Sequence, residues 1–121
     1  MEYLRENGRD HGIIMAELDE WLKENSDGRP VLVSDNNGFD AAFVAYYYAL
    51  AEMKNPFGFS SRRIGDLYSG FKQDARKASD WKRLRTAKHT HNALDDAKGN
   101  AGAVLKMAEM GLRIPGLTQT L

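Results

Sequence analysis

Two short segments of the chain carry side chains that suit acid–base or metal chemistry. The first is Ser34-Asp-Asn-Asn-Gly-Phe-Asp40, in which Asp35 and Asp40 are the candidate residues. The second is His89-Thr-His-Asn-Ala-Leu-Asp-Asp96, which offers imidazole bases beside two carboxylates. Imidazoles exchange protons near neutral pH, and carboxylate oxygens bind hard divalent cations. The two segments are therefore the candidate sites of chemistry in this chain.

Each segment also has an ordinary structural explanation. Residues 36–38, Asn-Asn-Gly, suit a tight turn, and Asp40 suits the first turn of a helix. If Asn92 caps the last helix, Asp95 is explained as its local capping partner, whereas Asp96 has no such local role. The histidines are compatible with a plain surface loop. Four ligands so close in sequence do not follow the paired spacing of a structural zinc site.

The elements expected around the first segment follow the order helix, strand, helix. An apolar stripe at helical spacing predicts a first helix that ends within residues 25–30. Its members are Ile14, Leu18, Trp21 and Leu22. Residues 31–33, Val-Leu-Val, predict a buried strand, and the apolar run 39–54 predicts a buried helix. This order is typical of an α/β fold, whose sheets bind ligands where the strands end.

The second half of the chain is expected to be mainly helical. Residues 62–68 fit either a short strand or a turn of helix, and residues 72–88 predict a basic helix. A loop over 88–91 leads to an amphipathic helix over 93–110 that ends at Gly111. At most two strands result, although a buried strand normally needs neighbours on both sides. We expect one domain over residues 1–121, mostly helical, with earlier strands missing or supplied from elsewhere.

Composition limits the class of protein. The chain has 121 residues, 42% of them hydrophobic and 28% charged, which excludes global disorder. It contains no cysteine, which excludes a disulfide scaffold, a thiolate nucleophile and a cysteine zinc site. No apolar run reaches the roughly 18 residues that a membrane span needs. We expect no membrane or targeting segment, and a cytoplasmic location by default.

The net charge is zero, but the charges are unevenly distributed. Residues 1–30 hold 8 acids against 4 bases, whereas residues 72–88 hold 2 acids against 7 bases. The basic stretch includes Lys82, Arg83 and Arg85 beside Trp81, a combination that suits phosphate contacts and one stacking surface. A solvated helix face explains the same composition without any ligand.

Taken together, the candidate segments resemble a known family. Gly38-Phe-Asp40 at a helix start and His91-Asn-Ala-Leu-Asp-Asp96 resemble the second and third motifs of the DEDDh family of 3′–5′ exonucleases, which have the ribonuclease H-like fold. Asn36 and Phe39 also fit the second motif, and the two motifs have the family's order and spacing. The resemblance runs from about residue 10 to residue 112. Within it, residues 55–66 look like those of a small bacterial or phage exonuclease group.

The resemblance implies hydrolysis of phosphodiester bonds from the 3′ end of single-stranded RNA or DNA. It implies two Mg²⁺ or Mn²⁺ ions, held by Asp40 and Asp96, and a proton transfer from water to His91. The resemblance assigns no role to His89. The residues expected to contact nucleic acid are Asn36, Trp81, Lys82, Arg83 and Arg85.

One departure from the family pattern is large. The first motif, an Asp-x-Glu on the first strand, is absent from these 121 residues, and Glu17-Leu-Asp19 lies on a helical pattern upstream of the strand. The expectation is a partial ribonuclease H-like domain: a fragment, a misplaced start or a degenerate relative. The alternative is a non-catalytic nucleic-acid-binding or assembly module. Incomplete strands also predict a homodimer or association with a missing N-terminal part.

Overall fold

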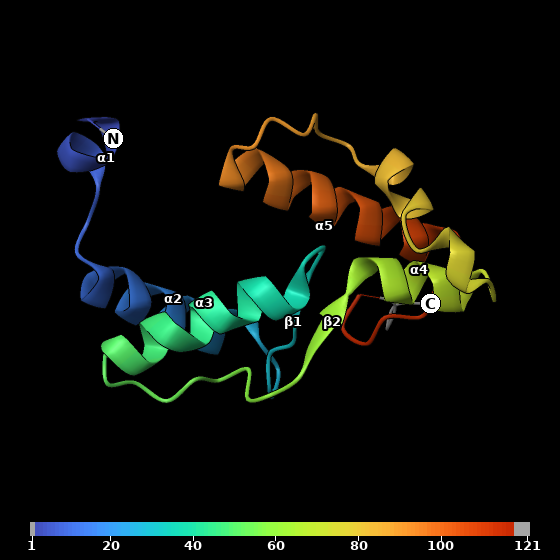
Figure 1. Ribbon diagram of the computed structural model, residues 1–121. Helices are drawn as coiled ribbons and strands as arrows, with labels where there is room; N and C mark the ends of the chain where they lie inside the picture. The colour runs from blue at the N-terminus through green and yellow to red at the C-terminus, as the bar shows by residue number, and fades with distance from the viewer. Residues whose placement is uncertain (1, 118–121) are drawn as a thin grey trace. The chain divides into compact units, whose positions relative to one another are not determined.

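The computed structural model describes residues 2–117, and these residues form two compact units (Figure 1). The first unit comprises residues up to Leu32 together with Gly38–Ser61. The second unit comprises Val33–Asn37 and the chain from Arg62 onward. Two separate stretches of sequence thus build each unit, and each unit is described by itself below.

The first unit contains α1 (Glu2–Asn7), α2 (His11–Asn25) and nearly all of α3 (Asn37–Leu50). Helix α2 begins at Asp10, whose side chain accepts hydrogen bonds from the N–H groups of Gly12 and Ile13. It ends at Asn25, so the first predicted helix is confirmed. Helix α1 was not predicted from the sequence.

The core of the first unit is small. Met15 and Leu22 on α2 and Tyr48 on α3 are buried, and the rings of His11 and Tyr47 lie 6.4 Å apart between the two helices. The prediction of a helix in the region 39–54 is confirmed, but the prediction that it is buried is wrong. Tyr48 is its one buried residue, because one neighbouring helix can cover only one stripe of a helix that is apolar all round.

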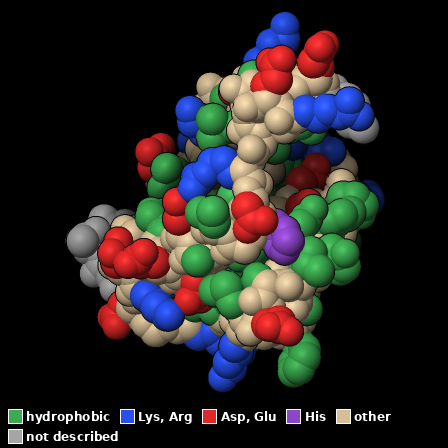
Figure 2. Space-filling model, turned by 90° about the vertical axis from the view of Figure 1, so that its left-hand side faces the viewer, with side chains coloured by type: hydrophobic (Ala, Val, Ile, Leu, Met, Phe, Trp, Pro, Cys, Tyr) green, Lys and Arg blue, Asp and Glu red, His purple; other side chains and the backbone are tan. Residues whose placement is uncertain are grey.

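Several large apolar side chains of α3 therefore remain exposed to solvent. They are Phe39, Phe43, Tyr46, Tyr47 and Leu50. The space-filling view in Figure 2 shows groups of hydrophobic side chains exposed on one face of the molecule. We call these five residues the α3 aromatic face.

The strands β1 (Leu32–Ser34) and β2 (Ser61–Arg63) pair in parallel, with α3 between them in the sequence. The predicted strand is confirmed, one residue later than expected, but it is not buried. Val33 is 37% exposed, because a sheet of two strands gives an apolar side chain few neighbours. The ambiguous segment 62–68 contains both predicted elements, since β2 leads directly into α4 (Ile64–Phe71).

In the second unit, the expected basic helix over 72–88 is replaced by two short 3₁₀ helices. These are η1 (Ala75–Lys77) and η2 (Asp80–Leu84). Gln73, two residues after the end of α4, adopts a left-handed φ of 53°, which prevents the helix from continuing. The carbonyl of Ala78 also approaches α4 at Gly65, where a Cβ atom would collide with it. This close approach requires glycine at position 65.

Helix α5 (Ala93–Glu109) completes the second unit, so the predicted last helix is confirmed. The chain leaves the helix at Gly111, whose φ of 110° favours glycine. The core of this unit lies between α4, η2 and α5. Its buried members are Ile64, Tyr68, Trp81, Ala103 and Met107. Among residues 2–117, no helix combines the length and apolar character that crossing a bilayer would demand.

Candidate active site

The loop that precedes α5 carries the second candidate segment. Thr86 lies against Gly102 of α5, where a Cβ atom would collide with the threonine side chain. Asn92 caps the helix by accepting hydrogen bonds from the N–H groups of Leu94 and Asp95 at 3.0 and 3.4 Å. The loop and the cap predicted from the sequence are therefore confirmed.

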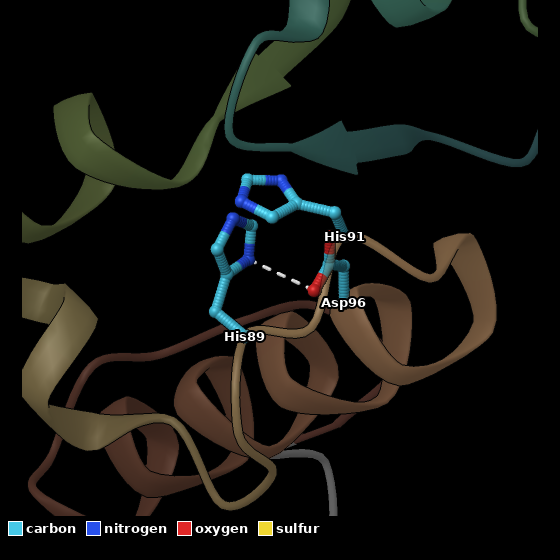
Figure 3. A group of neighbouring side chains, drawn as sticks. All are labelled: His89, His91 and Asp96. Atoms are coloured by element: carbon cyan, nitrogen blue, oxygen red, sulfur yellow. Dashed lines mark ion pairs between the residues drawn. The ribbon is translucent and has the colours of Figure 1, made fainter.

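Two histidines and one carboxylate meet at this helix start (Figure 3). The Nδ1 atom of His89 lies 2.8 Å from Oδ1 of Asp96. The rings of His89 and His91 are edge to face, with centroids 4.4 Å apart. One potential ligand atom from each of the three residues lies within 4.8 Å of the others. We call these three residues the His–His–Asp cluster.

Backbone conformation and hydrogen bonds hold this cluster together. His91 has a left-handed φ of 63°, a region that histidine enters more readily than most residues. Thr90 donates its N–H to Asp96 Oδ1 at 3.3 Å and its hydroxyl to Asp95 Oδ2 at 2.8 Å. The Thr90 hydroxyl also accepts the N–H of Asn92 at 3.3 Å. Thr90 therefore fixes the loop against both carboxylates, with one histidine on each side of it.

The two carboxylates differ in their surroundings. Asp95 binds the Thr90 hydroxyl and so has a local structural partner, although that partner is not the capping residue Asn92. The close contact of His89 Nδ1 and the hydrogen bond from the Thr90 N–H both fall on Oδ1 of Asp96, so neither of them uses Oδ2. The Asp96 side chain is 23% exposed, and both histidines are exposed. The cluster can therefore accept a proton or hold a cation in contact with solvent.

The first candidate segment is divided between the two units. Asp40 lies in the first turn of α3 in the first unit, where its carboxylate suits the positive end of the helix. Asn36 lies in a turn of the second unit. A joint metal site of Asp40 with Asp96 stays a prediction.

Asp35 has a role that the sequence did not reveal. Its Oδ2 atom lies 3.5 Å from Lys82 Nζ and 3.6 Å from Arg85 Nη2, and its backbone carbonyl accepts a hydrogen bond from Arg63 Nε at 3.3 Å. One aspartate thus joins the end of β1 to η2 and to the end of β2. The basic stretch in the sequence indicated that a counter-charge was needed, but it did not indicate which acidic residue supplies that charge.

Trp81 is fully buried in the core of the second unit, so the prediction that it stacks on nucleic acid is wrong. An indole ring beside several cationic side chains is typical of an exposed surface on which bases stack. Here the large apolar surface of the ring instead fills the space between α4 and α5. Arg83 donates to the Tyr68 hydroxyl at 3.0 Å, and this bond raises the pKa of Arg83. The phosphate contacts predicted for Lys82, Arg83 and Arg85 stay a prediction.

The chain matches a family model described as the 3′-5′ exoribonuclease Rv2179c-like domain, over residues 2–108. It belongs to this family. A curated relative, the 3′-5′ DNA exonuclease Cap18 of Escherichia coli, is 27% identical over 113 residues. The alignment covers 84% of this chain and 58% of Cap18, so the chain spans little more than half the length of that relative.

The match to the 3′-5′ exoribonuclease Rv2179c-like family includes both candidate segments. It also includes Glu17 and Asp19, the acids that are two residues apart. Both lie on α2, as the sequence predicted, and each forms an ion pair, Glu17 with Arg9 and Asp19 with Lys23. Their helical position agrees with the conclusion that they are not the first motif of the exonuclease pattern.

Proposed function

We propose that this chain forms part of a metal-dependent 3′–5′ exonuclease of the DEDDh type, which hydrolyses phosphodiester bonds of RNA or DNA from the 3′ end. The observation that carries the proposal is the proximity of His91 and Asp96, with ligand atoms within 4.8 Å of each other at the start of α5, in a chain that belongs to an exonuclease family. Membership of that family favours the exonuclease over a non-catalytic binding module.

His91 is proposed as the general base. Its imidazole is exposed and lies beside the carboxylate of Asp96, where a water molecule has access to a ring nitrogen. A neutral imidazole nitrogen takes the proton as the water oxygen attacks phosphorus. The left-handed backbone at His91 and the hydrogen bonds of Thr90 hold the ring at the helix start without closing it off from solvent.

Asp96 and Asp40 are proposed to hold Mg²⁺ or Mn²⁺. Asp96 fits this role, because its Oδ2 atom is left available by the loop and its side chain reaches solvent. Asp40 fits it as a half-buried carboxylate in the first turn of α3. When bound, such ions stabilise the negative charge that develops on the phosphate. Asn36, Lys82, Arg83 and Arg85 are proposed to contact the nucleic-acid backbone.

The test is stepwise shortening of 5′-labelled single-stranded RNA and DNA by the natural protein that contains this chain, with Mg²⁺ or Mn²⁺. Asp96→Asn removes the charge but keeps the size, so hydrolysis should fall by orders of magnitude with little change in folding stability. Asp95→Asn is the matched control, because its amide oxygen still accepts the Thr90 hydroxyl, and it should stay close to the unmodified protein. Equal losses in the two variants, or shortening from the 5′ end, would contradict the proposal.

A further inference from the structure

His89 is the member of the His–His–Asp cluster that the proposed exonuclease reaction does not use. It lies as close to Asp96 as any polar group in the loop, with Nδ1 at 2.8 Å from Oδ1, and its ring contacts that of His91. We infer that His89, His91 and Asp96 bind one transition-metal ion of the zinc class through two imidazole nitrogens and one carboxylate oxygen.

The donor set selects the class of metal. Imidazole nitrogen is a good ligand for Zn²⁺, Cu²⁺ and Ni²⁺, whereas Mg²⁺ and Ca²⁺ prefer oxygen ligands. Two of the three donors here are imidazoles. A site with three protein ligands and access to solvent leaves a fourth position for water, as in zinc sites that are not purely structural. The cluster therefore suits Zn²⁺ better than it suits a hard cation.

The geometry is close to what such an ion requires. Ligand atoms about 2.0–2.1 Å from a tetrahedral zinc ion lie roughly 3.4 Å from one another. The ligand atoms of the cluster all lie within 4.8 Å of one another, so the largest approach that an ion requires is about 1.4 Å. Both histidines are exposed, so solvent rather than packed protein surrounds the part of each ring that must move, while Thr90 fixes the backbone between them.

This site has a consequence for catalysis, which rests on the proposed function. An ion bound to His91 occupies the nitrogen that would take the proton, and it also occupies the carboxylate of Asp96. Zinc should therefore inhibit hydrolysis that Mg²⁺ or Mn²⁺ supports. His89 is the residue that separates the two roles, since it belongs to the inhibitory site alone.

The experiment is a titration of the whole chain with Zn²⁺ in competition with a chromophoric chelator, combined with NMR spectra of the three histidine rings. We expect one ion per chain, with signals of His89 and His91 that shift while that of His11 does not. His89→Ala and His89→Gln should each weaken zinc binding at least tenfold. His11→Ala and Asp95→Asn are the matched controls and should bind zinc like the unmodified chain.

Two results would overturn the inference whatever the enzymatic activity. One is zinc affinity that is unchanged in both His89 variants while their NMR spectra show a folded protein. The other is an equal loss of affinity in His11→Ala, which would indicate scattered surface binding. If zinc binds through His89 but no protein containing this chain hydrolyses nucleic acid with Mg²⁺ or Mn²⁺, the metal site stands and the proposed function fails.

Discussion

The guanidinium of Arg85 lies over the ring of Trp81, 4.8 Å from its centroid. The same side chain donates to Asn100 Oδ1 on α5 at 3.2 Å and faces the Asp35 carboxylate. Arg85 is only 13% exposed at its side chain, so most of its surface is used in these contacts. It therefore connects η2, α5 and the end of β1, with Trp81 as the apolar support beneath it.

Replacement of Trp81 should destabilise the second unit. Trp81→Ala removes the largest fully buried side chain among residues 2–117, and loss of a core aromatic residue costs about 3–5 kcal/mol of unfolding free energy. Urea unfolding followed by circular dichroism measures the effect. Trp21→Ala is the control, because that side chain is 57% exposed and should cost far less. If the Trp81→Ala variant is as stable as the unmodified chain but no longer binds nucleic acid, Trp81 is a residue on which a base stacks.

The basic stretch should bind nucleic acid more tightly when its internal counter-charge is removed. Asp35→Asn leaves Lys82 and Arg85 without their carboxylate, so single-stranded nucleic acid should bind more tightly and with a steeper salt dependence. Fluorescence anisotropy over a range of salt concentrations measures both. Asp19→Asn is the control, because it makes the same charge change at an ion pair with Lys23, outside residues 72–88.

The triple variant that neutralises Lys82, Arg83 and Arg85 supplies the opposite arm of the same experiment. It should weaken binding and flatten the salt dependence, since each phosphate contact contributes to the slope. If the affinity of the triple variant depends on salt as strongly as that of the unmodified chain, the basic stretch does not contact phosphate, and its charges are those of a solvated surface.

His91→Ala should lower the rate of hydrolysis by ~10²–10⁴, the usual contribution of a general base. Affinity for Mg²⁺ or Mn²⁺ should be retained, because the carboxylates are unchanged. Single-turnover rates of hydrolysis measure the loss, and circular dichroism checks that the variant is folded. A folded variant that keeps the full rate would assign the base to another group.

Tyr48→Phe should stabilise the first unit. The Tyr48 hydroxyl is buried and has no hydrogen-bond partner among the described residues, and an unsatisfied polar group costs about 1 kcal/mol or more. Burial, with a smaller contribution from Asp19, raises the pKa of Tyr48. The folded chain therefore keeps this proton where the unfolded chain loses it, so stability should fall as the pH rises above about 10.

The phenylalanine variant should lose that part of the alkaline fall, because it has no proton to release. Tyr46→Phe is the control, since Tyr46 is 60% exposed, and its stability should follow that of the unmodified chain at every pH. A destabilised Tyr48→Phe variant would mean that the hydroxyl has a partner in solution, such as a bound water molecule.

The α3 aromatic face should drive association. Exposed apolar patches of this kind mark interaction sites, and an unpaired strand edge adds hydrogen-bonding groups. We expect sedimentation at micromolar concentration to give a homodimer, or a complex with a separate piece that supplies further strands. Phe43→Ser should shift the equilibrium toward monomer, with Phe59→Ser as a control outside the face. A compact monomer with cooperative unfolding would contradict the prediction.

The sequence predicted the type of most elements but not what covers them. Periodicity located α2 and α5, and the cap at Asn92 follows from residue type alone, because these signals are local. Burial of α3 and exposure of Trp81 were both predicted wrongly, since each depends on neighbours distant in sequence. His91 and Asp96 were predicted as site residues from the resemblance to a motif, and their roles stay a prediction. His89 was not predicted as a member of the cluster. Its place there depends on the left-handed backbone at His91, which the spacing of residues in the sequence does not show.

The contact between Asp35 and Arg85 also constrains how the chain can fold during synthesis. The segment 33–37 leaves the ribosome well before η2, and the two partners of this ion pair are 50 positions apart in the sequence. The second unit therefore cannot close until nearly the whole chain has emerged, and contacts between distant residues form slowly. A fragment that starts at Arg62 would contain all of α4 and α5 but would lack the carboxylate that Lys82 and Arg85 share.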